Sequence, residues 1–246
     1  VAYFAELLEG YSEGGLVRSY GNRYYRKPII MGEITRPKPM TVGWWKFAQS
    51  LTSRPIKGML TGPYTIMDWS FNEYYPSRRA ATLAIAQVVR DEARDLERAG
   101  AQYIQIDEPS AAIVPGQIGE YVRMFNACVE GVRAKIAYHV CFGNLLSRPR
   151  GKRSYRWMFP ALQNAKCQQF VFEYANREMA EIEDWKEIGV DREIACGVVD
   201  VKSFYMEPAE EVAERIVLCA KYIPVEKLST VPDCGFFPVP RWVAFE

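Results

Sequence analysis

The sequence has almost no excess of charge of either sign. It contains 31 lysine and arginine residues against 30 aspartate and glutamate residues, a formal net charge of +1. Such an even balance offers no overall electrostatic attraction for nucleic acid or for an anionic membrane surface, so we expect neither as a partner. No stretch approaches the roughly 18 uninterrupted apolar residues of a membrane span. No signal peptide is visible either, although the chain opens on Val1 rather than on methionine.

Cysteine is present without the closely spaced framework of a disulfide-rich protein. The six cysteines are Cys128, Cys141, Cys167, Cys196, Cys219 and Cys234. In a chain of this length, such spacing favours a reducing compartment, and we expect a cytoplasmic protein whose cysteines are metal ligands or core residues. Four of them fall within predicted helices or at strand starts, which favours a core or surface position over a role as ligand: Cys128, Cys167, Cys196 and Cys219.

Short apolar runs alternate along the chain with segments of helical periodicity. The runs cover residues 28–33, 56–61, 103–107, 136–141, 170–173, 194–200 and 228–233. The helical segments cover residues 3–8, 41–51, 79–99, 118–132, 156–165, 178–188 and 208–222. Continuous apolar runs are typical of strands buried on both faces of a parallel sheet, and their alternation with helices indicates βαβ units.

This pattern predicts an α/β fold. Seven strands, with a helix before the first and no complete helix after the last, fit a (β/α)8 TIM barrel that lacks its first strand and its last helix. We expect residues 1–246 to form one catalytic barrel domain, truncated at both ends. A seven-stranded open sheet fits less well. A doubly wound sheet is the remaining alternative, but the Gly-x-Gly-x-x-Gly motif that usually follows an early strand of that fold is absent.

The ends of the predicted strands carry the candidate metal ligands. His139 is the only histidine, and it lies two residues before Cys141, so both side chains point to the same face of their strand. Active sites of such barrels lie at the C-terminal ends of the strands, where Glu173 and Cys234 also fall. We expect His139, Cys141, Glu173 and Cys234 to bind Zn²⁺, because Mg²⁺ and Ca²⁺ prefer all-oxygen shells. The alternatives are a purely structural zinc, a packed His-x-Cys pair, or a surface role for Glu173.

A zinc ion with two thiolate ligands suits a thiol substrate better than it suits water. Binding to the metal would deprotonate a thiol whose free pKa is about 8.5, and would keep it nucleophilic near neutral pH. Glu173 is the natural ligand to be displaced, since a carboxylate binds zinc less tightly than a thiolate. The chemistry expected from this ligand set is alkylation of a thiol.

These residues lie in segments that resemble a known family. The sequence is similar to the C-terminal catalytic barrel of cobalamin-independent methionine synthase. The matching segments run almost end to end: 19–23, 36–39, 57–63, 69–71, 90–92, 105–109, 139–141, 197–200 and 232–235. Each match is weak alone, but together they are specific.

The resemblance implies a (β/α)8 barrel and a zinc ion that activates homocysteine, held by the four ligands chosen above. It implies that Asp107 binds the amino group of the amino-acid thiol. It also implies that Trp69 stacks on a pterin, with Arg23 and Tyr24 nearby. Glu108 shares the strand end of Asp107 and is a further candidate for substrate binding; the alternative for either carboxylate is a cap or an ion pair.

The chain departs from the family at the expected proton donor. The family has a histidine where this sequence has Lys202, within residues 200–203. Lys202 is therefore a candidate catalytic acid, on condition that burial or a nearby positive charge lowers its pKa; the alternatives are an anion-binding lysine or one that points into solvent. Residues 148–156 form a basic stretch, which suits either a solvated loop or contact with an anion or an acidic partner.

We expect a methyltransferase that makes methionine from homocysteine, with methyl-folate or a corrinoid protein as the methyl donor. The missing histidine favours a methylcorrinoid, whose leaving group needs no protonation, whereas Trp69 favours a pterin. The main alternative is an alkyltransferase that acts on another thiol, such as coenzyme M, with an epoxide or other electrophile. Two further alternatives are uroporphyrinogen-decarboxylase-like chemistry, which needs no zinc, and a non-catalytic binding barrel.

Overall fold

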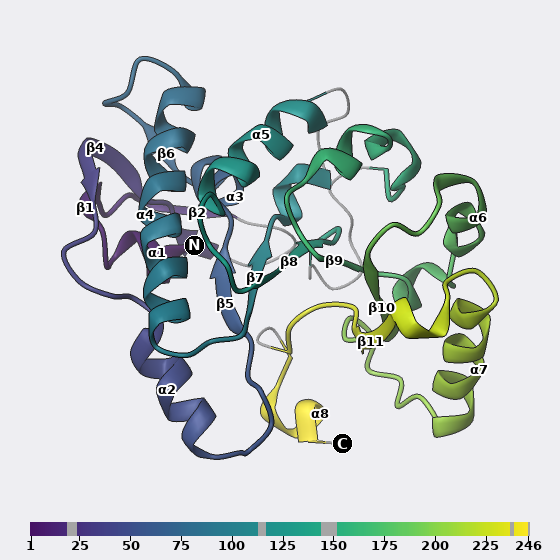
Figure 1. The fold of residues 1–246 in the computed structure, drawn as a ribbon. Coiled ribbons are helices and arrows are strands. Elements are labelled where there is room, and N and C mark those ends of the chain that lie inside the picture. The colour runs from purple at the N-terminus through teal and green to yellow at the C-terminus, as the bar shows by residue number, and fades with distance from the viewer. Residues whose placement is uncertain (19–23, 113–116, 144–151, 237–238, 246) are drawn as a thin grey trace.

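A parallel six-stranded sheet forms the centre of the computed structural model, which describes residues 1–18, 24–112, 117–143, 152–236 and 239–245 (Figure 1). The strand order is β11-β10-β9-β8-β7-β5. The strands are β5 (Gly58–Thr61), β7 (Tyr103–Asp107), β8 (Lys135–Val140), β9 (Gln169–Phe172), β10 (Glu193–Val199) and β11 (Leu228–Pro232). Each strand pairs with the next strand of this sheet in the sequence. A doubly wound sheet reverses its strand order at a switch point, so this order argues against that alternative.

The first predicted strand belongs to a different sheet. Residues 28–33 lie mostly within β4 (Ile29–Thr35), which pairs antiparallel with β1 (Glu9–Ser12) and parallel with β6 (Phe71–Asn72). Both edges of β4 are therefore occupied by strands outside the central sheet. Among the described residues, six of the seven predicted strands make the parallel sheet, and β5 and β11 are its edges. The remaining strands of the described residues, β2 (Leu16–Arg18) and β3 (Tyr24–Arg26), pair antiparallel with each other.

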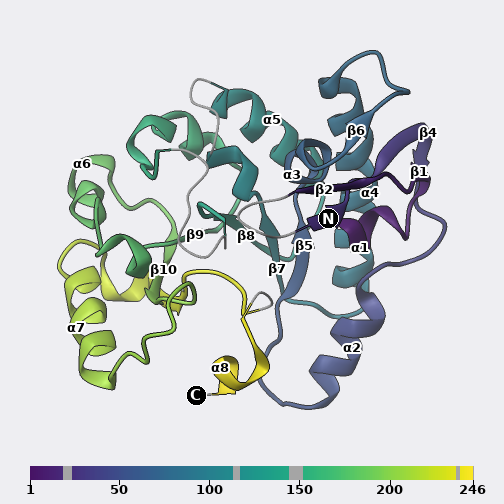
Figure 2. The ribbon, with the colours of Figure 1, turned by 180° about the vertical axis from the view of Figure 1, so that it is seen from behind.

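Helices cover the outer face of the sheet in both ribbon views (Figures 1 and 2). Four predicted helices are confirmed: α2 (Val42–Ser50), α4 (Arg78–Arg98), α5 (Ile118–Cys128) and α7 (Ala209–Ala220). The others are short: α1 (Ala2–Ala5), α3 (Pro63–Asp68), α6 (Trp185–Ile188) and α8 (Arg241–Phe245). Helix α4 begins after Ser77, whose Oγ accepts a hydrogen bond from the Ala80 amide at 3.1 Å. Its apolar face packs against α5 and β5.

Two predicted helices are interrupted. Residues 156–165 form two 3₁₀ turns, η2 (Arg156–Met158) and η3 (Ala161–Asn164), because Pro160 lacks an amide hydrogen and holds Phe159 extended. Residues 178–188 are broken by left-handed backbone at Glu178, Met179 and Glu181, which a right-handed helix cannot contain. The remaining 3₁₀ turns are η1 (Pro109–Ala112), η4 (Ala175–Arg177), η5 (Ile182–Asp184) and η6 (Val225–Lys227).

The core has two unequal parts. The larger part lies between the sheet and the helices, and it contains the four cysteines predicted not to be ligands: Cys128, Cys167, Cys196 and Cys219. The smaller part lies on the inner face of the sheet, where Ala137, Val171 and Ala195 pack together with Val231. Since side chains alternate along a strand, His139 lies on the same inner face as Ala137.

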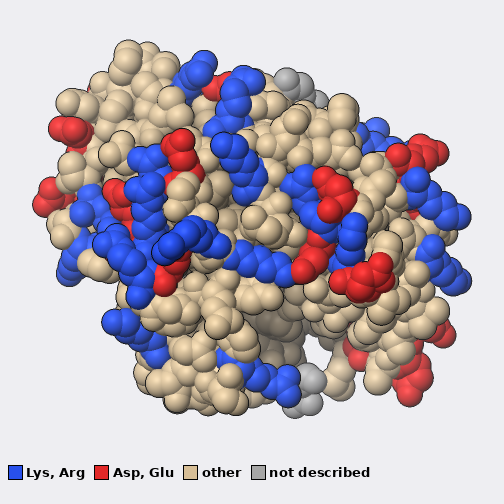
Figure 3. Space-filling model, viewed as in Figure 1, with Lys and Arg blue, Asp and Glu red and all other residues tan. Residues whose placement is uncertain are grey.

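Charged side chains of both signs are interspersed over α4 and α5 on the face seen in Figure 3. Three ion pairs account for part of this pattern: Arg90 with Glu130, Arg133 with Glu97, and Arg98 with Asp95. On this face, positive and negative side chains therefore lie next to one another, as expected from the near-zero net charge of the sequence.

Candidate metal centre

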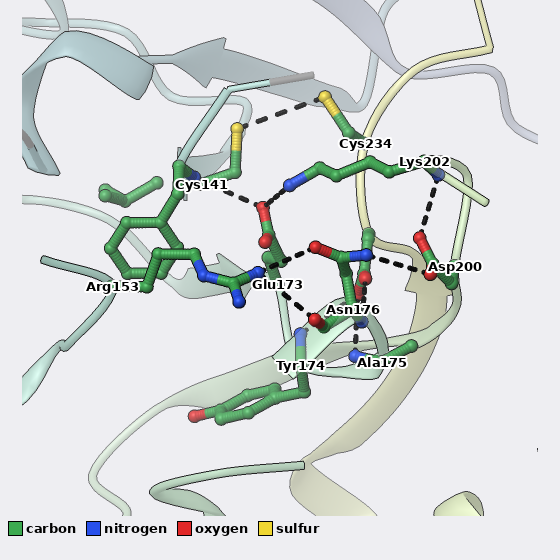
Figure 4. Close-up of polar contacts among 12 residues, drawn as sticks. Cys141, Arg153, Glu173, Tyr174, Ala175, Asn176, Asp200, Lys202 and Cys234 are labelled. Atoms are coloured by element: carbon green, nitrogen blue, oxygen red, sulfur yellow. Dashed lines mark hydrogen bonds and ion pairs between the residues drawn. The ribbon is translucent and has the colours of Figure 1, made fainter. Parts of the chain in front are cut away.

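Three of the four predicted metal ligands converge at the C-terminal edge of the sheet. One nitrogen of His139 and the Sγ atoms of Cys141 and Cys234 all lie within 4.8 Å of one another. The two Sγ atoms are 4.0 Å apart (Figure 4). His139 is on β8, Cys141 directly follows it, and Cys234 follows β11. Two strands separate β8 from β11, and neighbouring strands are about 4.8 Å apart, so the sheet must curve toward its inner face to bring these side chains together.

The donor atoms fit a soft divalent cation. Nδ1 of His139 is buried and has no hydrogen-bond partner among the described residues, and the same is true of Oε1 of Glu173. A buried polar atom without a partner costs about 1–3 kcal/mol, which a bound cation would offset. The neighbouring Cys141 thiol, followed by burial, raises the pKa of the Cys234 thiol. Positive charge is therefore needed to hold both sulfurs as thiolates, and one imidazole with two thiolates is a ligand set that zinc uses.

Glu173 lies beside this cluster, and one of its two carboxylate oxygens already has partners. Its Oε2 accepts a hydrogen bond from the Phe142 amide at 3.2 Å and is ion-paired with Nζ of Lys202. Both charged side chains are almost completely buried, at 2% exposure for Lys202 and 0% for Glu173. Among the described residues, Glu173 is not part of the group whose donor atoms lie within 4.8 Å. Its partnerless Oε1 remains the atom with which it would reach a metal.

Two groups that sequence reasoning missed hold the backbone around Glu173. The hydroxyl of Tyr155 donates to the Val140 carbonyl at 2.9 Å and accepts from the Glu173 amide at 3.0 Å, which joins the ends of β8 and β9. The side chain of Asn176 bridges two neighbours, accepting from Arg153 at 2.7 Å and donating to Asp200 at 2.9 Å. Asp200 in turn accepts from the amide of Lys202 at 2.8 Å, so this chain of contacts fixes the loop that carries Lys202.

Asp233 ties the strand end that carries Cys234 to the one that carries Glu173. Its carboxylate accepts from the amides of Tyr174 and Ala175 at 2.9 Å each and of Asn176 at 2.6 Å. Burial raises the pKa of Asp233 to about 7, against the effect of these hydrogen bonds. Gly197 makes room for this carboxylate, because a Cβ at that position would lie 2.2 Å from Oδ1. The sequence placed Asp233 at a strand end, but the partners of its carboxylate come from a loop some 60 residues away.

Asp107 and Glu108 end β7 but face different surroundings. Asp107 is the register partner of His139, and its Oδ1 accepts from Nε2 of Gln105 at 2.8 Å. Burial raises the pKa of Asp107. Glu108 is 1% exposed and accepts from the Tyr64 amide at 2.9 Å and from the amide and hydroxyl of Thr65 at 2.8 and 2.6 Å. Glu108 thus caps α3, which supports the capping alternative for this residue and leaves Asp107 as the candidate for substrate binding.

Of the residues predicted to bind a pterin, Trp69 and Tyr24 are described, and the tyrosine that contacts Trp69 is Tyr25 instead of Tyr24. The Nε1 of Trp69 donates to Oγ of Ser110 at 3.2 Å, and the indole packs against Tyr25 with ring centroids 5.1 Å apart. Tyr24, the predicted neighbour, is 63% exposed on β3. Successive side chains of a strand point to opposite faces, so Tyr25 and Tyr24 cannot both face Trp69. Arg23 lies outside the described residues.

The basic stretch 148–156 is described only from residue 152 onward. Within that part, Arg153 donates to the side chain and carbonyl of Asn176, and Arg156 forms a bidentate pair with Asp184 at 2.5 and 2.6 Å. These two arginines therefore bind groups of the protein itself.

Comparison with known proteins decides the family. The family profile described as "Cobalamin-independent synthase, Catalytic domain" matches residues 1–243. The chain belongs to this family.

Curated relatives of this catalytic domain are methyltransferases. The chain is 35% identical over 247 residues to "Methionine synthase" of Saccharolobus solfataricus, covering 100% of this chain and 71% of that protein. It is 37% identical to "5-methyltetrahydropteroyltriglutamate--homocysteine methyltransferase" of Rhodopseudomonas palustris, covering 96% of this chain but only 30% of that much longer protein. This cobalamin-independent synthase domain therefore spans most of the archaeal relative and less than a third of the bacterial one.

A solved structure supports the same assignment. The B12-independent methionine synthase of Shewanella sp. W3-18-1, in complex with selenomethionine, superposes with a TM-score of 0.88 at 28% identity. The match covers 99% of this catalytic domain and 74% of that chain. Within the part of the domain that is described, no helix is both long enough and apolar enough to cross a membrane.

Proposed function

We propose that this protein is a zinc-dependent methyltransferase that transfers a methyl group to the thiol of homocysteine, giving methionine. The observation that carries the proposal is the buried cluster of His139, Cys141 and Cys234, next to the partnerless Oε1 of Glu173. The named activities of the relatives support it, and so does the presence of selenomethionine, the selenium analogue of methionine, in the Shewanella structure.

His139, Cys141 and Cys234 would hold the zinc, with Glu173 as the fourth ligand in the absence of substrate. Zinc bound there would act as a Lewis acid that keeps the substrate sulfur as a thiolate at neutral pH. Asp107 binds the ammonium group of the amino acid through a charge-assisted hydrogen bond. Because Asp107 is the register partner of His139, the amino group and the sulfur of one small molecule would reach their sites together.

Lys202 is ion-paired with the Glu173 carboxylate and would keep it paired if a substrate thiol replaced it as a zinc ligand. The ion pair supplies a buried counter-charge, so the released carboxylate is not left unpaired in a low-dielectric site. The role of Lys202 as a proton donor to the methyl carrier remains a separate prediction.

The methyl donor would approach from the side of Trp69. The Trp69–Tyr25 pair, which joins the end of α3 to β3, would offer aromatic surface to a pterin or to a corrinoid. We further propose that the curved six-stranded sheet is part of an eight-stranded barrel, and that residues 1–246 act as one catalytic domain.

Incubation of the zinc-loaded protein with homocysteine tests the proposal, with methylcobalamin in one arm and methyl-folate in the other. Methionine formed in either arm supports the proposal and identifies the donor class. A parallel arm replaces homocysteine with coenzyme M and an epoxide. Product only in that arm would replace the proposed function by the alkyltransferase alternative, and zinc-containing protein inactive in every arm would contradict it.

A further inference from the structure

Lys57 joins two glutamine side chains on the inner face of the sheet. The residue directly precedes β5, and its Nζ donates to Oε1 of Gln105 at 3.2 Å and to Oε1 of Gln169 at 3.1 Å. Gln105 is on β7 and Gln169 is on β9, and both are at least nine-tenths buried. The contact between Lys57 and Gln169 spans 112 residues of sequence.

The register of the strands explains how one ammonium reaches both amides. Gln105 is the register partner of Ala137 on β8, and Ala137 is the register partner of Gln169 on β9. Ala137 therefore lies between the two glutamines, and it is fully buried. Its methyl group is small enough to leave space above β8 for the Lys57 side chain to extend between the glutamines.

The donors and acceptors of this group can be satisfied in one orientation only. An ammonium donates and never accepts, so it must meet the oxygen end of each amide. Nε2 of Gln105 is then directed to Oδ1 of Asp107, at 2.8 Å, and a carboxylate is the acceptor that this donor requires. On the opposite side, Nε2 of Gln169 donates to Oε2 of Glu193 at 3.1 Å. The ammonium at the oxygen end and the carboxylate at the nitrogen end therefore hold the Gln105 amide in the same orientation, and without Lys57 only the carboxylate would hold it.

Electrostatic attraction between Lys57 and Asp107 favours the same arrangement as the hydrogen bonds. Burial raises the pKa of Asp107, while the charges of His139 and Lys57 and the hydrogen bond from Gln105 oppose that rise. Burial lowers the pKa of Lys57, and Asp107 opposes that change. Lys57 and Asp107 therefore stabilise one another's charged forms by direct electrostatic attraction, and the hydrogen bond from Gln105 adds to the stabilisation of the Asp107 carboxylate.

We propose that Lys57 is a positioning residue for the amino-acid site: by fixing the Gln105 amide, it directs the Asp107 carboxylate so that Oδ2 receives the ammonium group of the substrate. The inference rests on the proposed function, because it deepens the role assigned there to Asp107. It gives specificity for a thiol that carries an amino group, and it adds nothing to the binding of the sulfur.

Two thiols that differ only in the amino group test the inference. Homocysteine and 4-sulfanylbutanoate are titrated into zinc-loaded protein by calorimetry. We expect Lys57→Met to weaken homocysteine binding roughly tenfold or more, as expected for a hydrogen bond to a charged group, and to leave 4-sulfanylbutanoate binding unchanged. Gln105→Leu removes the donor to Asp107 directly and is expected to show the same selective loss, even if Lys57→Met does not fold. Lys57→Arg keeps a cationic donor and is expected to retain part of the selectivity.

Lys186→Met is the control. Lys186 is on α6, its Nζ lies over the ring of Tyr222, and it makes no described contact with Lys57, Gln105 or Gln169. This variant is expected to bind both thiols like the unmodified protein. The inference is overturned if Lys57→Met and Gln105→Leu weaken both thiols equally or neither.

The proposed role of Asp107 and the proposed role of Lys57 can fail separately. If the unmodified protein binds both thiols equally well, and Asp107→Asn changes nothing, the assignment of Asp107 under the proposed function is wrong. If Asp107→Asn abolishes the preference for homocysteine but Lys57→Met preserves it, Asp107 binds the amino group without help from Lys57, and only the present inference fails.

Discussion

Lys202 and Glu173 form an ion pair in the buried centre of the protein, beside the thiols of Cys141 and Cys234 (Figure 4). The family resemblance places a proton-donating histidine where Lys202 lies. In this protein, the ammonium instead binds the carboxylate that was predicted as the fourth zinc ligand. The pair therefore competes with the metal for Glu173, and this competition can be measured.

Replacing Lys202 by methionine is expected to tighten zinc binding by roughly tenfold. The change frees Glu173 for the metal and removes a positive charge from the neighbourhood of a dication, and both effects favour zinc. Competition with a chromophoric chelator measures the affinity. Lys202→Arg keeps the charge and is expected to stay close to the unmodified protein. Equal zinc affinity in Lys202→Met and the unmodified protein would show that the ion pair does not restrain Glu173.

The metal-free form of Lys202→Met is expected to be less stable. Removing one partner of a buried ion pair leaves the other charge uncompensated, which typically costs about 3–5 kcal/mol. The free energy of unfolding, measured in denaturant in the presence of a chelator, checks this. The double variant Lys202→Met with Glu173→Gln is expected to recover much of the loss, because no unpaired charge remains.

Zinc content is expected to depend on Cys141 and Cys234, and not on Cys196 or Cys219, two free thiols that lie beside each other in the core. Cys141→Ser and Cys234→Ser each remove a thiolate ligand and should lower bound zinc well below one ion per chain, together with methyl transfer. Cys219→Ser is the control, since Cys219 is buried beside Cys196 in the core. Atomic absorption on dialysed protein gives the stoichiometry. Full zinc in both ligand variants would refute the site.

Gly197→Ala is expected to destabilise the protein and weaken zinc binding together. The added Cβ would lie 2.2 Å from Oδ1 of Asp233 and 2.8 Å from its Cα, so the turn that carries Cys234 must shift. Overpacking of this kind costs about 1–3 kcal/mol. Gly43→Ala is the matched control, because its Cβ meets nothing within 4 Å and alanine favours a helix. The thermal midpoint and the zinc affinity measured with the chelator should both fall in Gly197→Ala but not in Gly43→Ala. Equal values in the two variants would contradict the role of Asp233.

Glu108 is expected to make stability fall as pH rises toward neutral. Burial raises the pKa of this carboxyl from 4.5 to about 7. Between these values the folded protein retains a proton that the unfolded chain has lost, so the free energy of unfolding decreases with pH, by up to about 1.4 kcal/mol per pH unit. The contribution is fully lost once the pH passes about 7.

Denaturation at pH 5 and pH 8 checks this prediction. Glu108→Gln cannot ionise, so its free energy of unfolding should fall less between the two pH values than that of the unmodified protein. Glu226→Gln, at an exposed position, should leave the pH dependence unchanged. Identical pH dependence in Glu108→Gln and the unmodified protein would contradict the raised pKa.

Local patterns in the sequence were enough for much of the fold and for the core of the candidate site. Apolar runs and helical periodicity located six strands of the central sheet and four long helices, because burial imposes these periods on neighbouring residues. The spacing of His139 and Cys141 predicted that both side chains point the same way at the end of β8, where the structure brings them together. The rule that the active site of a barrel lies at the C-terminal ends of its strands then added Cys234, whose Sγ lies 4.0 Å from that of Cys141 across 93 residues.

Tertiary structure decided what depends on contacts between distant residues. The place of β4 in a separate sheet, the ion pair of Lys202 with Glu173, and the bridging of Gln105 and Gln169 by Lys57 have no local signature. Glu108 and Asp107 are adjacent and chemically alike, yet one caps α3 and the other faces the metal cluster, because successive side chains of a strand point to opposite faces. Residue type and spacing set which chemistry is available, and only the curvature and register of the sheet determine which groups meet.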